Sequence, residues 1–326
     1  MGSKEVEAVA ESAVGQRGGA WTTLRGLSRP QSSRVGGYAG YVALLTLLFL
    51  QPLTRLFLYA YTAKGGLYSH ILVIPFIAGC LLYMEWEWPW AAERSSIWGA
   101  ITMGGIGFAA LALAIGSHGS TGSSGGLALV TLSFVSFVAA GGFLSLGSKW
   151  MAAMAFPLTF LILMVPLPAV AVDWLEHASA IASAVAAAVY LKFTGLLLGR
   201  HGVVLDLPGI SLQVGPECSG IRSSWVLLIV TLLTAHRFLR TRWHRIVMVA
   251  VVVPLGILRN GFRIWVVGLL CVRIGPHMID SPIHRHGGPL FLALSLIPMS
   301  LLLWWFRSRE RRYKSSQILS SAVREH

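Results

Sequence analysis

The sequence predicts an all-α polytopic membrane protein, a bundle of about eight transmembrane helices. Of its 326 residues, 55% are hydrophobic and only 12% are charged, which is too apolar for an ordinary soluble domain. Several stretches reach the roughly 20 apolar residues that a membrane helix needs. Arginines gather at the ends of these stretches. Together these observations indicate a multi-pass integral membrane protein.

The basic charge of the chain bears on its partners. A formal net charge of +13 can indicate nucleic-acid binding in a soluble protein. Here the basic clusters flank apolar spans, as Lys and Arg do in cytoplasmic loops and at lipid headgroups. We therefore expect membrane lipids as partners and no nucleic acid. The 3 cysteines have no CxxC spacing, so we expect neither a disulfide framework nor a zinc knuckle. We expect no cofactor.

The chain divides into three parts. Residues 1–36 are rich in Ser, Gly, Glu and Arg and lack apolar periodicity, so we expect a disordered cytoplasmic tail. The membrane-embedded domain is expected at 37–306, and a basic cytoplasmic tail at 307–326. The first apolar run, from Tyr38, is already long enough to be a retained span and is not a signal peptide.

The expected spans follow from length and hydropathy. They are 38–57, 71–90, 97–117, 127–146, 151–167, 222–235, 246–263 and 289–306. Arginine clusters precede the first span, follow the sixth and follow the last. Because positive charge stays on the cytoplasmic side, both ends of the chain are expected there.

The stretch 169–198 is long and Ala-rich but polar at its start, and it carries Lys192. Its early polar residues are Asp173, Glu176 and His177. If this stretch crossed the membrane, the sixth span would end with arginines outside, against the positive-inside rule. We therefore expect an interfacial or re-entrant helix.

Over residues 201–214 the apolar residues no longer follow the spacing of a helix. Apolar residues alternate in the second half, after Pro208 and Gly209. This predicts a short β-hairpin or extended loop on the extracytoplasmic face.

Cys218 is the strongest candidate for a catalytic residue. It lies in a polar run at the start of the sixth span, where backbone N–H groups favour a thiolate. Arg222 follows at i+4, on the same helix face, and favours the thiolate further. Cys80 and Cys271 lie in apolar surroundings, where packing is the expected role.

The predicted topology brings cations and histidines to the same face as Cys218. Arg259 and Arg263 share a face near the outer end of the seventh span, and His284 and His286 precede the last span. Cysteine attack on a carbonyl needs a thiolate, a base or cation, and donors for the oxyanion. Snorkelling to the interface is the alternative for Arg259. The His-x-His pair has no third ligand at a suitable spacing, so we do not expect a metal site there.

Three motifs carry a resemblance to a known family. They are Glu-Cys-Ser-Gly-Ile-Arg-Ser at 217–223, Asn-Gly-Phe-Arg-Ile at 260–264, and a His four residues before Gly288. Tyr-Ser-His at 68–70 and the hairpin before Cys218 add to them. In this order and spacing, the chain resembles the exosortase/archaeosortase family of membrane transpeptidases over about residues 40–306.

The resemblance implies that Cys218, Arg263 and His284 are the catalytic residues. The usual acidic residue after the His is replaced by Arg285, so His286 is the alternative catalytic histidine. Supporting or substrate-binding roles are expected for Arg222, Arg259, Asn260, Glu217, His286 and His70.

The resemblance also implies a function in the bacterial inner membrane, with the active site facing the periplasm. Such a protein cleaves a C-terminal sorting tag of exported proteins, consisting of a short signature such as Pro-Glu-Pro, a transmembrane helix and a basic tail. A Cys thioester forms, and an envelope acceptor that the sequence does not identify resolves it. The expected partners are the tag helix, lipids and this acceptor nucleophile. The alternatives are a transporter or channel, which usually shows repeated halves, and a non-catalytic component of exopolysaccharide export.

Overall fold

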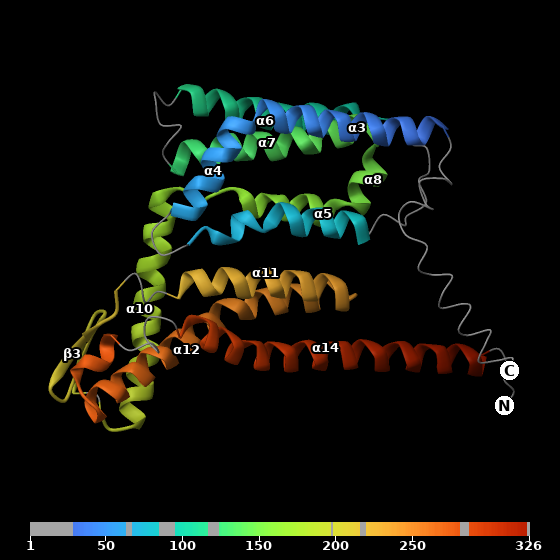
Figure 1. Ribbon diagram of the computed structural model, residues 1–326. Helices are drawn as coiled ribbons and strands as arrows, with labels where there is room; N and C mark the ends of the chain where they lie inside the picture. Colours follow the sequence, from blue (N-terminus) through green and yellow to red (C-terminus); the bar gives the residue numbers. More distant parts are fainter. Residues whose placement is uncertain are drawn as a thin grey trace, which may run out of the picture. The chain divides into compact units, whose positions relative to one another are not determined.

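The computed structural model is helical along most of its described length (Figure 1). It describes residues 29–62, 67–84, 95–116, 124–196, 198–215, 220–280 and 287–324. Within these residues, 5 helices are long and apolar enough to cross a membrane, or 6 if one bent pair is a single span. The predicted all-α polytopic bundle is confirmed, and the number of eight crossings stays a prediction. The chain forms two compact units, Met1–Ala169 and Val170–His326.

The first unit opens with a bent helix pair where the sequence predicted one span over 38–57. The helix α3 (Arg29–Leu48) begins inside the segment expected to be a disordered tail, and α4 (Leu50–Thr62) follows it at a bend of 69°. Pro52 explains the break, because it has no N–H to donate to the carbonyl of Leu48 and its ring crowds that carbonyl.

The next predicted spans of the first unit differ in how closely they match. The helices α6 (Ile97–Gly116) and α7 (Ser124–Ser145) agree with the predicted spans over 97–117 and 127–146. The predicted span over 71–90 begins as a short 3-10 helix, η2 (Ser69–Leu72), and continues as α5 (Ile74–Met84). Its remaining residues lie outside the described part of the chain.

The predicted span over 151–167 is wrong as a continuous helix. The chain forms α8 (Ser148–Ala153), α9 (Ala155–Phe160) and the 3-10 helix η3 (Leu161–Met164). Pro157 cannot donate to the carbonyl of Ala153, the residue at which α8 ends.

The second unit contains a small antiparallel sheet. Its elements are α10 (Ala169–Phe193), β1 (Gly199–His201), β2 (Val204–Leu207), β3 (Ile210–Gln213), α11 (Ile221–Phe238), α12 (Arg242–Arg273), η5 (Pro276–Asp280) and α14 (Gly288–Arg324). The strand order is β1-β2-β3, and β2 and β3 turn at Pro208 and Gly209, where Gly209 has a φ of 81°. The predicted hairpin is confirmed, and β1 adds a third strand.

A core of small and aliphatic residues joins α10, the sheet and α12. It contains Ala180, Ala184, Ala187 and Leu191 of α10, Leu205, Leu207, Leu212 and Val214 of the hairpin, and Ile264 of α12. The alanines let α12 come close, because a Cβ at Gly261 would lie 2.6 Å from the Cβ of Ala186.

The helix α10 is continuous over 25 residues and apolar enough to cross a membrane. In Figure 1 it runs across the direction of α11 and α14. The interfacial or re-entrant position that the sequence suggested for it stays a prediction.

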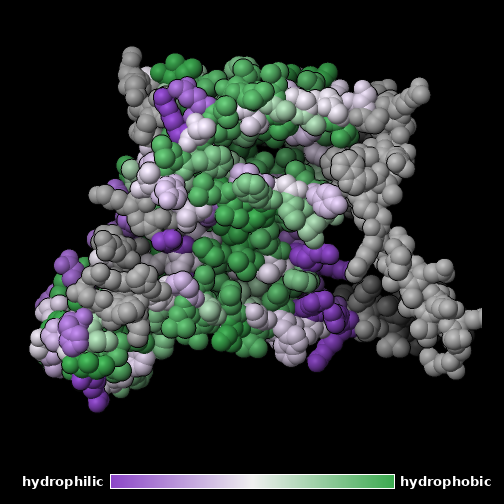
Figure 2. Space-filling model, in the orientation of Figure 1, coloured by the Kyte–Doolittle hydropathy of each residue, from purple (hydrophilic) through white to green (hydrophobic). Residues whose placement is uncertain are grey.

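Hydrogen bonds also join the turn between α11 and α12 to α14. The Glu310 carboxylate of α14 accepts hydrogen bonds from the backbone N–H groups of Arg240 and Thr241, both at 3.0 Å, and lies 2.7 Å from Nδ1 of His244. In the second unit, hydrophilic residues gather around the sheet and around the α11–α12 turn, with hydrophobic residues between them (Figure 2). This distribution suits helices that place two polar ends on opposite sides of a membrane.

Candidate functional site

The structure describes five of the nine predicted site residues. Four lie in the second unit, namely Arg222, Arg259, Asn260 and Arg263, and His70 lies in the first. Glu217, Cys218, His284 and His286 lie outside the described residues. The site is therefore built here from the elements that flank Cys218 along the chain and from α12.

Gly220 is the residue at which the chain enters α11. It has a φ of 71°, a left-handed conformation that glycine adopts without strain. Its carbonyl accepts the N–H of Ser224 at 3.1 Å and the hydroxyl groups of Ser223 and Ser224, both at 3.0 Å. The first turn of α11 is thus fixed on Gly220, a residue of the motif at 217–223.

Arg259 of α12 holds the same carbonyl from the other side. Its Nη2 donates to the Gly220 carbonyl at 3.1 Å and contacts the Ser224 hydroxyl at 3.2 Å. The Arg259 side chain is only 6% exposed. A buried guanidinium is costly unless hydrogen bonds compensate for lost hydration. These contacts compensate in part, because Nη1 of Arg259 is buried with no hydrogen-bond partner among the described residues. The structure thus describes Arg259 packed against α11, and its role in the site stays a prediction.

Small residues allow α11 and α12 to approach closely at this point. A Cβ at Gly220 would lie 2.9 Å from Cγ of Asn260, which is itself buried. A Cβ at Gly256 would lie 2.8 Å from the Ser224 hydroxyl oxygen. Larger residues at either glycine would push the helices apart and lengthen the hydrogen bonds of Arg259.

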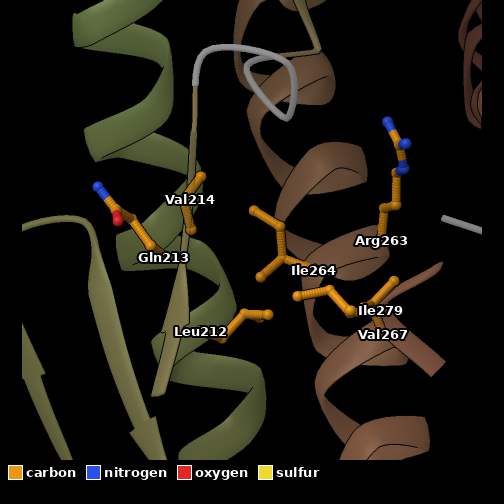
Figure 3. Close-up of a pocket in the computed structure, with 7 residues that line it drawn as sticks. All are labelled: Leu212, Gln213, Val214, Arg263, Ile264, Val267 and Ile279. Atoms are coloured by element: carbon orange, nitrogen blue, oxygen red, sulfur yellow. The ribbon is translucent and has the colours of Figure 1, made fainter. Parts of the chain in front are cut away.

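Arg263 lies one helical turn beyond Arg259, is half-buried, and borders a small pocket of about 50 Å³. The lining residues are Leu212, Gln213, Val214, Arg263, Ile264, Val267 and Ile279. Figure 3 shows Leu212, Val214, Ile264 and Ile279 pointing toward one another, and the guanidinium of Arg263 pointing away from them. The arginine thus presents its charge at the rim of an apolar pocket.

The remaining two described residues differ in their surroundings. Arg222 is exposed in the first turn of α11. His70 is buried in η2, with Nδ1 lying 3.2 Å from the Leu67 carbonyl oxygen. His70 belongs to the first unit.

The sequence reasoning missed the roles of Ser224 and Gly256. Ser224 was part of no motif, although a Ser four residues after Gly220 can fold its hydroxyl back onto that carbonyl. A glycine in an arginine-bearing apolar helix is a weak sign of close packing. In the described part of the chain, no group of three or more His, Cys, Asp or Glu residues is arranged to hold a metal ion.

Comparison with known proteins gives one family. The model of the family described as Transmembrane exosortase (Exosortase_EpsH) matches residues 62–301. Neither the curated proteins nor the solved structures give a match. The matched region includes the start of α11, all of α12 and the pocket beside β3.

Proposed function

Because the chain belongs to the transmembrane exosortase family, we propose that it is a cysteine transpeptidase that removes a C-terminal sorting tag from exported proteins. The observation that carries the proposal is the hydrogen bond from Arg259 to the Gly220 carbonyl. It joins Arg259, which directly precedes the motif at 260–264, to Gly220 within the motif at 217–223, 39 residues away in the sequence.

Covalent geometry limits how far the nucleophile can be from this bond. Cys218 precedes Gly220 by two residues, and consecutive Cα atoms are 3.8 Å apart, so the two Cα atoms are separated by at most about 7.6 Å. Arg263 is the i+4 neighbour of Arg259 on α12, with Cβ atoms about 5–6 Å apart. These limits support the proposal that the Cys218 thiol and the two guanidinium groups serve one site.

In the proposed reaction, the Cys218 thiolate attacks the scissile peptide carbonyl of the tag. Arg263 donates hydrogen bonds to the oxyanion of the tetrahedral intermediate. His284 protonates the leaving amine as the C–N bond breaks, which leaves a thioester on Cys218 and frees the tag helix. An acceptor nucleophile then attacks the thioester carbonyl, a new acyl bond forms, and the thiolate is restored.

The other predicted residues take supporting roles. Arg259 and Asn260 hold the start of α11, and Arg222 adds positive charge that favours the thiolate. Glu217, His70 and His286 are proposed to support the site or bind substrate. With the arginine-rich α11–α12 turn on the cytoplasmic side of the inner membrane, the sheet and Gly220 face outside.

A tag reporter tests the proposal. It is an exported fluorescent protein followed by Pro-Glu-Pro, an apolar helix of about 20 residues and an arginine-rich tail. In membranes, the wild-type protein is expected to shorten this tag reporter, and Cys218→Ala to leave it at full length. Cys80→Ala is the matched control, because Cys80 is exposed in α5 and its loss leaves no cavity.

Cleavage of the tag reporter by Cys218→Ala at the wild-type rate would contradict the proposal. The same assay separates the histidines. His284→Ala is expected to be inactive and His286→Ala to keep most of its activity. The reverse result would move the acid to His286 and leave the chemistry unchanged.

A further inference from the structure

The strand β3 has an open edge on the side away from β2. Val214 donates to the Val203 carbonyl at 3.0 Å, and the register pairs Leu205 with Leu212 and Leu207 with Ile210. Hydrogen-bonded and non-bonded pairs alternate in an antiparallel ladder. The N–H and C=O groups of Ser211 and Gln213 therefore point outward.

No strand among the described residues pairs with this outer edge, because the sheet order ends at β3. The strand itself is held firmly, since Leu212 and Val214 are buried in the core with α10 and α12. An edge with unpaired backbone groups is a template for another strand.

The pocket of Figure 3 lies between this strand and α12, with η5 contributing Ile279. Its volume of about 50 Å³ compares with the roughly 10–15 Å³ that a cavity needs to hold one water molecule. The pocket thus has room for one short apolar side chain, beside the charge of Arg263. Main-chain pairing at an edge combined with a pocket for a side chain is how strand addition recognises a peptide.

The position of the edge in the chain indicates the occupant. Gln213, the last residue of β3, precedes Cys218 by five residues, so a peptide paired along this edge leads toward the proposed nucleophile. We propose that the outer edge of β3 binds the extended signature of the sorting tag as a fourth strand, with one short apolar side chain in the pocket. This inference rests on the proposed function and adds the mode of substrate recognition.

Proline tests the backbone part of the proposal, since it removes an N–H and is tolerated at strand edges where that N–H faces outward. Gln213→Pro is expected to slow cleavage of the tag reporter by about 10-fold, as lost hydrogen bonds predict. Gln213→Ala keeps the N–H and removes only the side chain, so it is expected to slow cleavage less than Gln213→Pro does.

Arg200→Pro is the matched control on the opposite edge of the same sheet. The register places Gly199 and His201 in the pairs bonded to β2, so the N–H of Arg200 also points outward. This variant is expected to cleave normally. Equal rates for Gln213→Pro and the wild type would overturn the inference while leaving the proposed function intact.

If the wild-type protein does not cleave the tag reporter, that result counts against the proposed function. Cross-linking still tests the inference in that case, because it measures binding and not cleavage. A benzophenone amino acid at position 213 or 200 is introduced into Cys218→Ala, and membranes containing the tag reporter are irradiated. The expected adduct joins position 213 to the tag reporter, with none from position 200. An adduct only with a second copy of the chain, or no adduct from position 213, would overturn it.

Discussion

Two helix pairs of this protein use glycine in different ways. Between α6 and α7, glycines make room for aromatic rings: a Cβ at Gly99 would lie 2.6 Å from the ring of Phe143, and one at Gly107 would lie 2.9 Å from Phe137. Between α11 and α12, Gly220 and Gly256 instead make room for polar groups. The first pair joins apolar surfaces, and the second encloses hydrogen-bonded side chains.

The difference separates scaffold from candidate site. Membrane helices associate through small residues and van der Waals packing, which is all that the α6–α7 pair needs. Burying Arg259 and Asn260 in the α11–α12 pair is costly, and intramembrane ionisable residues mark functional sites. We therefore expect changes in the α11–α12 pair to reduce cleavage, and changes in the α6–α7 pair to reduce stability alone.

The largest expected effect is at Arg263. If it binds the oxyanion, Arg263→Ala should lower the initial rate of tag-reporter cleavage by about 100-fold or more. Arg263→Lys should rescue this poorly, because an ammonium on a flexible stem does not reproduce the planar guanidinium. Arg259→Ala should lose less, since it acts through Gly220. A rate for Arg263→Ala equal to that of the wild type would remove it from the site.

Matched glycine substitutions compare the two helix pairs directly. In Gly220→Ala, the left-handed φ and the contact with Asn260 both oppose the new Cβ, so cleavage should fall about 10-fold. In Gly99→Ala, the Phe143 ring must move, so the unfolding temperature should fall while the cleavage rate per folded molecule stays unchanged. The measurements are thermal unfolding in detergent and the tag-reporter rate. A loss of rate in Gly99→Ala alone would reverse the comparison.

The smallest expected effect is at Ser224. Ser224→Ala removes a hydroxyl that contacts Arg259, while Arg259 keeps its bond to the Gly220 carbonyl. Ser223→Ala is the control, because the Ser223 hydroxyl donates to the same carbonyl while the Arg259 bonds within the described residues go to Gly220 and Ser224. Ser224→Ala and the control both lose a hydroxyl bond to the Gly220 carbonyl, so the additional loss is the one hydrogen bond with Arg259, about 1 kcal/mol, which predicts a rate a few-fold below that of the control. An equal loss of cleavage rate in both variants would show that the contact between Ser224 and Arg259 does not contribute to the rate.

The helical fold was predictable where apolar runs are uniform, as in α6 and α7, because length and hydropathy decide there. The breaks before α4 and α9 were missed. Pro52 and Pro157 lie near the starts of those helices, where proline is tolerated, and hydropathy averaged over a span hides the lost bond to the preceding turn.

The candidate site was predictable only in part. The i+4 spacing placed Arg259 and Arg263 on one helix face, and the hairpin followed from Pro208 and Gly209. The bond between Arg259 and Gly220 was not predictable, because it depends on how closely α11 packs against α12. The distance between the two helices is set by Gly256 and Ser224. Neither residue type indicates a functional site by itself.

The central claim is that Cys218 carries the cleaved protein as a thioester, and hydroxylamine trapping tests it most directly. Hydroxylamine attacks a thioester carbonyl and leaves a hydroxamate at the new C-terminus of the tag reporter, which mass spectrometry distinguishes from a carboxylate. The account predicts a hydroxamate with the wild-type protein and an uncleaved tag reporter with Cys218→Ala. A carboxylate alone, formed at the wild-type rate in both proteins, would contradict it.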